Sequence, residues 1–299
     1  MTLSQTSPSN GAGSPEVTGF YDADTGSIQY LVADPETKDA ALIDVVMSFD
    51  PASAATDTTS ADAILRHARA AGYRITWVLD THPHADHLMA SSYLKEQTGA
   101  PNAIGEKVTG IAELWRDYYH LPDAFDPQAD FDRLFADGDS FRIGNLPVRV
   151  MLSPGHTLGS ISYIVGDDAA FVHDTFMQPD VGTSRADFPG GSASDLYRSL
   201  QEILSLPDHT RLFIGHDYGT SYRKMPAWES TVAEQRRHNA HIGGGVDEED
   251  FVKKRESRDA TLALPDRMLH VLQMNLRAGR LPPAEADGAH YLKIPLNKF

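Results

Sequence analysis

The stretch "THPHADHLMAS", residues 81–91, places three histidines and an aspartate within six positions. These residues are His82, His84, Asp86 and His87. They directly follow the β-type run "RITWVLD", and the proline between the first two histidines favours a turn, on which neighbouring side chains can converge. Imidazole and carboxylate groups suit Zn(II), Fe(II) or Mn(II). The pattern therefore predicts a metal site on the loop that follows this strand.

Three further ligand-type residues lie at equivalent places along the chain. His156 follows the run "LPVRVML", Asp174 ends "AAFVHD" and His216 ends "RLFIGH". Because each is the first strong ligand after a β-type run, we expect all three at the same rim of the sheets as the histidine cluster. His173 precedes Asp174 and would point to the opposite face if the strand persists, so a ligand role is not expected for it.

Composition excludes several classes of protein. The chain has 299 residues, a net charge of −16 and no cysteine. An acidic surface repels phosphate backbones, so nucleic acids and anionic membranes are not expected partners. Without cysteine there is no disulfide scaffold, thiolate metal site or cysteine nucleophile. No apolar run of about 18 residues and no secretory signal is found, so we expect a cytoplasmic enzyme.

The order of patterns predicts a layered α/β domain. Residues 1–15 are small and polar, which predicts a disordered tail, and residues 16–299 are expected to form a single domain. "GSIQYLVAD" and "DAALIDVV" are typical of a hairpin, and "SADAILRHARAAGY" of an amphipathic helix. Helices are also expected over residues 193–207 and 227–242, and in a helical C-terminal part over 247–279.

The motifs "HPHADH", "PGHT", "HD" at 173–174 and "GHD" at 215–217 resemble those of the metallo-β-lactamase fold superfamily. The resemblance implies an αββα sandwich with metal ligands on loops at one edge of paired sheets. The activity does not follow from this fold, because the superfamily hosts hydrolases, nucleases and redox enzymes.

Other segments resemble the persulfide dioxygenase branch, above all "GTSRADFPGGSASDLYRSL" at 182–200 and "HDYG" at 216–219. That branch oxidises glutathione persulfide with O2 to sulfite and glutathione. The resemblance implies one catalytic Fe(II) held by His82, His156 and Asp174, a set that leaves coordination positions open for substrate and O2. The remaining four ligand-type residues would then orient the site; they are His84, Asp86, His87 and His216.

A hydrolase related to glyoxalase II is the main alternative. It would cleave S-acylglutathione thioesters with two Zn(II), adding His84 to the first metal and using Asp86, His87 and His216 at the second. All of these residues are present, so the ligand inventory does not separate the two mechanisms. A metal- or sulfide-responsive binding protein without turnover stays open as a third class.

Glutathione carries two carboxylates, so its site should offer cationic side chains. Arg185, in the loop after Asp174, and Tyr218 are the predicted substrate contacts. Lys253, Lys254 and Arg255 are either further contacts or a solvated helix face. A homodimer is compatible with an enzyme of this size.

Overall fold

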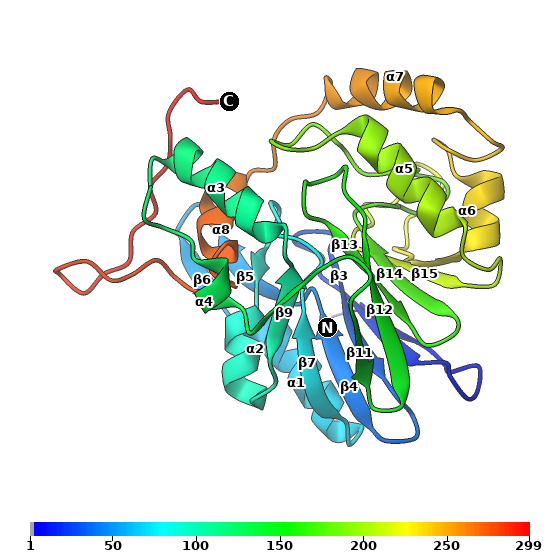
Figure 1. Cartoon of the computed structure of the whole chain (residues 1–299). Helices are drawn as coiled ribbons and strands as arrows, with labels where there is room; N and C mark the ends of the chain where they lie inside the picture. Colours follow the sequence, from blue (N-terminus) through cyan, green and yellow to red (C-terminus); the bar gives the residue numbers. More distant parts are fainter. Residues whose placement is uncertain (1–2) are drawn as a thin grey trace.

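Two β-sheets pack face to face in the computed structural model, which describes residues 3–299 (Figure 1). Within that range the first sheet has the order β1 (Leu3–Ser7), β2 (Glu16–Tyr21), β3 (Ile28–Ala33), β4 (Asp39–Ile43), β7 (Arg74–Leu79), β9 (Asn102–Gly105) and β10 (Arg133–Phe135). The second has the order β11 (Ser140–Ile143), β12 (Leu146–Leu152), β13 (Ile161–Val165), β14 (Ala169–His173), β15 (Arg211–Ile214) and β16 (Glu229–Thr231). A small sheet joins β6 (Ala55–Asp57), β5 (Val46–Asp50) and β8 (Leu88–Met89).

Helices cover the outer faces of both sheets and complete the predicted αββα sandwich. They are α1 (Thr59–Ala70), α2 (Ser91–Thr98), α3 (Val108–Tyr119), α4 (Pro127–Asp130), α5 (Ala193–Leu204), α6 (Val232–His238), α7 (Glu248–Asp259) and α8 (Met268–Asn275). The apolar side of α1 packs on the outer face of the first sheet, and α5 and α6 pack on the second. Figure 1 shows α7 lying across α5, beyond the sheets. None of the helices within residues 3–299 is long and apolar enough to cross a membrane.

The core between the sheets explains why the strands hold the site firmly. Tyr30 of β3 packs edge-on against Phe171 of β14 and Phe213 of β15, with ring centroids 5.2 and 5.6 Å apart. The Tyr30 hydroxyl donates to the carbonyl of Ile214, so its polar end is satisfied inside the core. The loops that follow β14 and β15 therefore start from strands that are fixed in the core.

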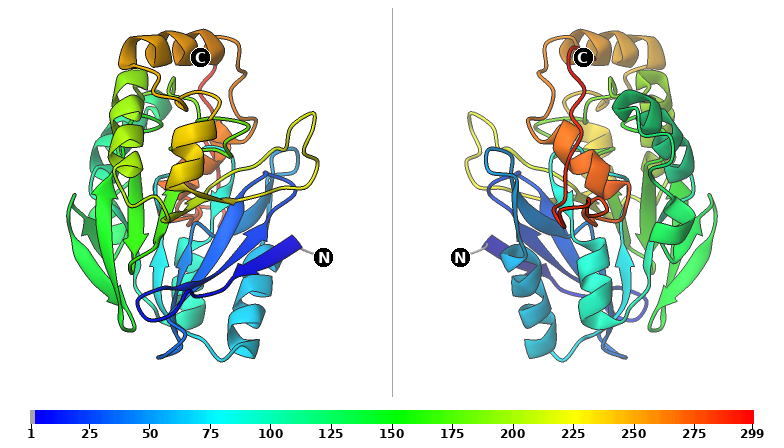
Figure 2. Two further views of the ribbon diagram at one scale, coloured as in Figure 1. Left: turned by 90° about the vertical axis from the view of Figure 1, so that its right-hand side faces the viewer. Right: turned by 90° about the vertical axis from the view of Figure 1, so that its left-hand side faces the viewer.

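The N-terminal segment differs from the prediction. Leu3–Ser7 pairs antiparallel with β2 as an edge strand, so the disordered tail predicted over residues 1–15 is wrong for this part (Figure 2); residues 1–2 lie outside the described residues. The strand has no hydrophobic alternation that could reveal it. A buried ion pair between Arg211 and Asp168 holds the segment instead, because the guanidinium also donates to the Ser7 hydroxyl and the carbonyl of Pro15.

A second difference concerns the helix predicted over residues 227–242. Its first part is β16, and α6 begins only at Val232. The Thr231 hydroxyl accepts from the backbone N–H of Glu234, and the Glu234 carboxylate accepts from the N–H of Thr231. This capping box fixes the start of the helix after the strand. The other predicted strands and helices are confirmed, including the hairpin of β3 and β4.

Candidate metal centre

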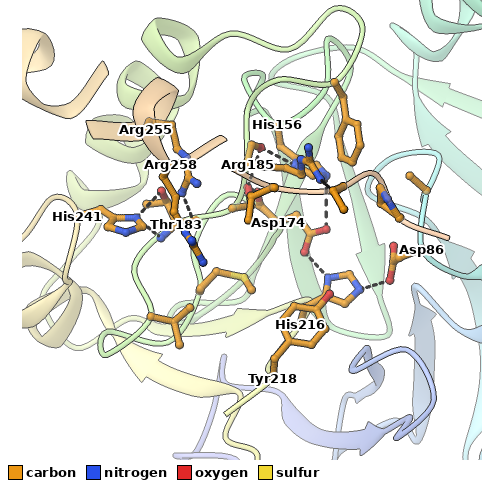
Figure 3. Close-up of a pocket in the computed structure, with 18 residues that line it drawn as sticks. Asp86, His156, Asp174, Thr183, Arg185, His216, Tyr218, His241, Arg255 and Arg258 are labelled. Atoms are coloured by element: carbon orange, nitrogen blue, oxygen red, sulfur yellow. Dashed lines mark hydrogen bonds and ion pairs between the residues drawn. The ribbon is translucent and has the colours of Figure 1, made fainter. Parts of the chain in front are cut away.

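Strand ends bring the predicted ligands together at one edge of the two sheets, and Figure 3 shows Asp86, His156, Asp174 and His216 of this set. His82 comes after β7 of the first sheet, whereas His156, Asp174 and His216 come after β12, β14 and β15 of the second. All four side chains are buried. The arrangement predicted from the strand-end positions is therefore observed.

One group consists of two imidazoles and a carboxylate. The Oδ2 atom of Asp174 lies 3.7 Å from Nε2 of His82 and 3.5 Å from Nε2 of His156. Ligand atoms of the three residues all lie within 4.8 Å of one another. Two histidines and one carboxylate are the ligand set of many non-haem Fe(II) sites, which keep other coordination positions open.

Hydrogen bonds at the far side of each ring decide which nitrogen faces this group. Nδ1 of His156 lies 2.8 Å from the carbonyl oxygen of Arg185, which can only accept, so Nδ1 carries the hydrogen. The Thr81 hydroxyl donates to Asp44 at 2.9 Å and therefore accepts from Nδ1 of His82 at 3.0 Å. Both Nε2 lone pairs thus face the Asp174 carboxylate. Lone pairs and a carboxylate oxygen that share one buried space fit a bound cation.

The remaining predicted residues form an adjoining group. His216 lies between two carboxylates, with Nδ1 2.6 Å from Oδ1 of Asp174 and Nε2 2.6 Å from Oδ2 of Asp86. Ligand atoms of His84, Asp86 and His87 lie within 4.8 Å of one another. Within residues 3–299, Nδ1 of His84 and Nε2 of His87 are buried and have no hydrogen-bond partner. This second group could also accept a metal ion.

Electrostatics keep the first group in its metal-binding protonation states. Burial lowers the pKa of His82 well below its ordinary value, and neighbouring His84 and His156 add to the effect. Burial by itself would raise the pKa of Asp174, but the charge and hydrogen bond of His216 outweigh it and hold that pKa far below the usual range. A neutral imidazole and an ionised carboxylate are the forms that bind metals.

His173 points into the site, contrary to the prediction. The pairing of β14 with β15 shifts register between Phe171 and His173, and His173 has a φ of +42°. The period-2 alternation therefore breaks one residue before Asp174. Gly215 makes room, since a Cβ there would lie 2.4 Å from Nδ1 of His173.

Asp44 is a site residue that the sequence reasoning missed. Its buried carboxylate forms an ion pair with His173 and lies 3.0 Å from Nε2 of His84. It also accepts from the backbone N–H of Thr81 at 2.8 Å. Asp44 directly follows β4, so the strand-end signal that identified the other ligands was available for it too.

The C-terminal helix α8 supports the histidine loop. The Asn275 side-chain amide donates to the carbonyls of His84 and His87, at 2.7 and 2.8 Å. Its carbonyl accepts from the backbone N–H of Met89 at 2.9 Å. One fully buried side chain thus fixes both ends of the segment that carries Asp86.

A cavity of about 340 Å³ opens beside the metal ligands (Figure 3). Asp86, His156, Asp174 and His216 line one end, and its walls include Met177, Val181, Leu262 and Pro265. The predicted substrate contacts both lie on it. The Tyr218 ring, 65% exposed, stacks on His216 with centroids 5.9 Å apart.

Arg185 also lines the cavity, but its guanidinium is already engaged. It forms a bidentate ion pair with Asp187, at 2.6 and 2.8 Å, and donates to the carbonyl of Ala263 at 2.6 Å. It also lies over the Phe188 ring at 4.8 Å. These contacts hold the loop whose carbonyl orients His156, so a structural role is evident, and substrate binding by Arg185 stays a prediction.

The cavity ends in a cationic region that the sequence did not identify as a unit. Arg255 and Arg258 supply its positive charge, and His241 lies beside them. Burial, together with the positive charges of Arg255, Lys254 and Arg258, lowers the pKa of His241 to about 4, so its imidazole is neutral near pH 7. Arg255 is paired with Asp259 at 2.7 Å, whereas Arg258 forms no ion pair with any carboxylate in residues 3–299. Lys253 and Lys254 are exposed.

The family described as the metallo-beta-lactamase superfamily matches residues 25–216, which include every metal-ligand candidate above. The chain belongs to this superfamily. Among relatives within it, the beta-lactamase hydrolase-like protein of Xylella fastidiosa is 57% identical over 95% of this chain. The chain spans only 65% of the length of that relative. Glyoxylase B2 of Dictyostelium discoideum is 40% identical over 93% of this chain and 96% of its own length.

Two comparisons within the superfamily concern ETHE1. The human protein, a mitochondrial persulfide dioxygenase, is 29% identical over 93% of this chain and 95% of its own length. The crystal structure of ETHE1 from Myxococcus xanthus superimposes with a TM-score of 0.70 and 30% identity, covering 88% of this chain and 98% of that one. These likenesses support the persulfide dioxygenase branch of the superfamily.

Proposed function

We propose that this chain is a mononuclear non-haem Fe(II) dioxygenase that oxidises glutathione persulfide. One persulfide, one O2 and one water give sulfite, glutathione and two protons, which balances sulfur, oxygen, hydrogen and charge. The observation that carries the proposal is the convergence of His82, His156 and Asp174, with both Nε2 lone pairs aimed at one carboxylate. A bound Fe(II) would supply the redox capacity that Zn(II) lacks, and three protein ligands would leave coordination positions open.

The cavity suits a substrate whose sulfur must reach this group while an anionic end lies elsewhere. Its ligand end is formed by His156 and Asp174, and its opposite region carries Arg255 and Arg258. The wall between them includes the apolar side chains of Met177, Val181 and Leu262. Arg258, which has no carboxylate partner within residues 3–299, is the side chain best able to bind a substrate carboxylate.

Several residues around the candidate ligands hold them in place, and Tyr218 also lies where the substrate would bind. Thr81 and the Arg185 carbonyl hold the two imidazoles in the tautomer that presents Nε2. Tyr218, stacked on His216 at the cavity mouth, can shield the sulfur end from solvent. Such partners orient metal ligands and commonly change metal affinity by about 10–100-fold.

A binuclear hydrolase of S-acylglutathione thioesters is the second candidate. It is favoured by Nδ1 of His84 and Nε2 of His87, which are buried without a hydrogen-bond partner within residues 3–299, and by the word hydrolase in the names of two relatives. Two metal ions would polarise the thioester carbonyl and lower the pKa of the attacking water.

One experiment separates the two functions. Protein purified without O2 is loaded with Fe(II), its metal is counted, and O2 uptake and sulfite are measured after adding glutathione persulfide. About one iron per chain with O2 uptake and stoichiometric sulfite supports the dioxygenase. Two metals per chain, thioester hydrolysis and no O2 uptake would refute it in favour of the hydrolase.

A further inference from the structure

The hydroxyl of Ser27 lies among the side chains that a second metal ion would need. Its Oγ atom is 3.3 Å from Oδ2 of Asp86, 3.1 Å from Nδ1 of His87 and 3.0 Å from Nε2 of His216. We infer that Ser27 blocks the second metal position and thereby makes this a one-metal centre. The inference deepens the proposed function, because it names the residue that selects the mononuclear chemistry.

The backbone fixes Ser27 at this place. Ser27 forms an antiparallel bridge with His216, in which the N–H of Ile28 donates to the carbonyl of Gly215 at 2.7 Å. On the other side of the bridge, the N–H of Asp217 donates to the carbonyl of Gly26 at 3.0 Å. The backbone hydrogen bonds on both sides therefore hold Ser27 next to His216.

The turn before Ser27 adds two constraints. Oγ1 of Thr25 lies 2.8 Å from Oγ of Ser27, which holds the hydroxyl in its rotamer. Gly26 has a φ of +73°, and a Cβ on it would lie 2.5 Å from Cε1 of Tyr218, so the turn is packed against the cavity mouth. Ser27 itself is only 1% exposed.

The chemistry of a serine hydroxyl explains why its presence matters. Zn(II) and Fe(II) sites in proteins use imidazole, carboxylate and thiolate, so a neutral hydroxyl fills space among the ligands without replacing one. A second ion would have to displace the Ser27 hydroxyl from Nε2 of His216 and Oδ2 of Asp86, and also break the 2.6 Å contact between His216 and Asp86.

The first group has no comparable obstacle. Within residues 3–299, neither Nε2 of His82 nor Nε2 of His156 has a hydroxyl partner, and Oδ2 of Asp174 faces only these nitrogens. An ion can bind there without displacing a hydrogen bond. Ser27, which lies outside the ligand motif, therefore accounts for the different metal affinity that we infer for the two positions.

The test is the number of metal ions that the full chain binds. Wild type, Ser27→Ala and the control Ser230→Ala are loaded without O2 with excess Fe(II) and, separately, with Zn(II). Metal per chain is then counted after gel filtration, and the affinity for the second Zn(II) is measured by chelator competition. Ser230 is a suitable control because it is buried and its hydroxyl bonds to Gln235, not to a metal-ligand candidate.

We expect about one ion in wild type and Ser230→Ala and about two in Ser27→Ala, with the second Zn(II) bound at least about tenfold more tightly than by wild type. Ser27→Gly removes the same oxygen and serves if the alanine variant does not fold. The inference is overturned if wild type already binds two ions with similar affinity. It is equally overturned if the Ser27 variants keep the second-ion affinity of wild type within about twofold.

The outcome is separable from that of the proposed function. One iron per chain in wild type without O2 uptake would refute the dioxygenase and leave the role of Ser27 intact. O2 uptake by wild type together with unchanged metal binding in both Ser27 variants would refute only the role of Ser27.

Discussion

Thr81→Val tests whether the metal ligands depend on their hydrogen-bonded supports. Valine keeps the shape of the buried threonine but removes its hydroxyl. The change deletes the 2.9 Å bond to Asp44 and the 3.0 Å bond from Nδ1 of His82. The Asp44 carboxylate keeps the backbone N–H of Thr81, whereas the His82 Nδ1–H is left buried without a partner.

The magnitude follows from these two losses. A buried donor left unsatisfied costs about 1–3 kcal/mol, so the free energy of unfolding of the metal-free protein should fall by that amount. The lost tautomer control should in addition weaken metal binding by about 10–100-fold, as for other partners of ligating histidines.

Urea unfolding of the metal-free protein measures the first effect and chelator competition for Zn(II) the second. Thr210→Val is the matched control, because its hydroxyl is buried and has no partner within residues 3–299. It should leave metal affinity unchanged. A folded Thr81→Val protein that binds Zn(II) within about twofold of wild type would refute the assignment of Nε2 of His82 as a ligand held by Thr81.

Three further predictions concern the ligands, the cavity and pH. His156→Ala or Asp174→Ala should lose nearly all bound iron and O2 uptake, since each removes one of three ligands; full activity in either variant would refute the ligand set. Arg258→Ala should raise KM for glutathione persulfide about five-fold with kcat unchanged, because an exposed charge contributes only about 1 kcal/mol; Arg198→Ala, an exposed arginine on α5, should change neither, and a lower kcat at constant KM for Arg258→Ala would contradict the assignment. Burial would raise the pKa of Asp44, but His173 and His84 hold it well below its ordinary value. As the pH falls below about 4, the unfolded chain therefore takes up a proton that the folded chain does not, and the metal-free protein should lose stability. Asp44→Asn should reduce this acid sensitivity in urea midpoints measured at pH 7 and pH 3.5, and an unchanged difference would argue against it.

The convergence of the metal-ligand candidates was predictable because its signal is local. Each of His82, His156, Asp174 and His216 follows an apolar run, and strands of stacked sheets end at a common rim. Asp44 has the same position after β4, but a single aspartate after one strand is also typical of a turn. Its role depends on contacts with His84 and His173, which lie far away in the sequence.

The remaining differences arise where tertiary contacts override local patterns. Strand alternation places His173 on the wrong face, because the register shift at its strand end does not appear in the sequence. The cationic end of the cavity joins His241 of one loop to Arg255 and Arg258 of α7, and only the packing of α7 beside that loop brings them together. The edge strand β1 likewise forms through Arg211, more than 200 residues away in the chain.

Asn275 determines how much of the chain is needed to keep the metal-ligand candidates in place. The superfamily match ends at residue 216, yet the loop that carries His84 and His87 is fastened by a side chain nearly sixty positions further on. A fragment that ends at residue 216 would keep every candidate ligand. It would lose the Asn275 hydrogen bonds that hold the histidine loop. Truncation upstream of α8 should therefore loosen this loop and weaken metal binding, although every candidate ligand stays in the chain.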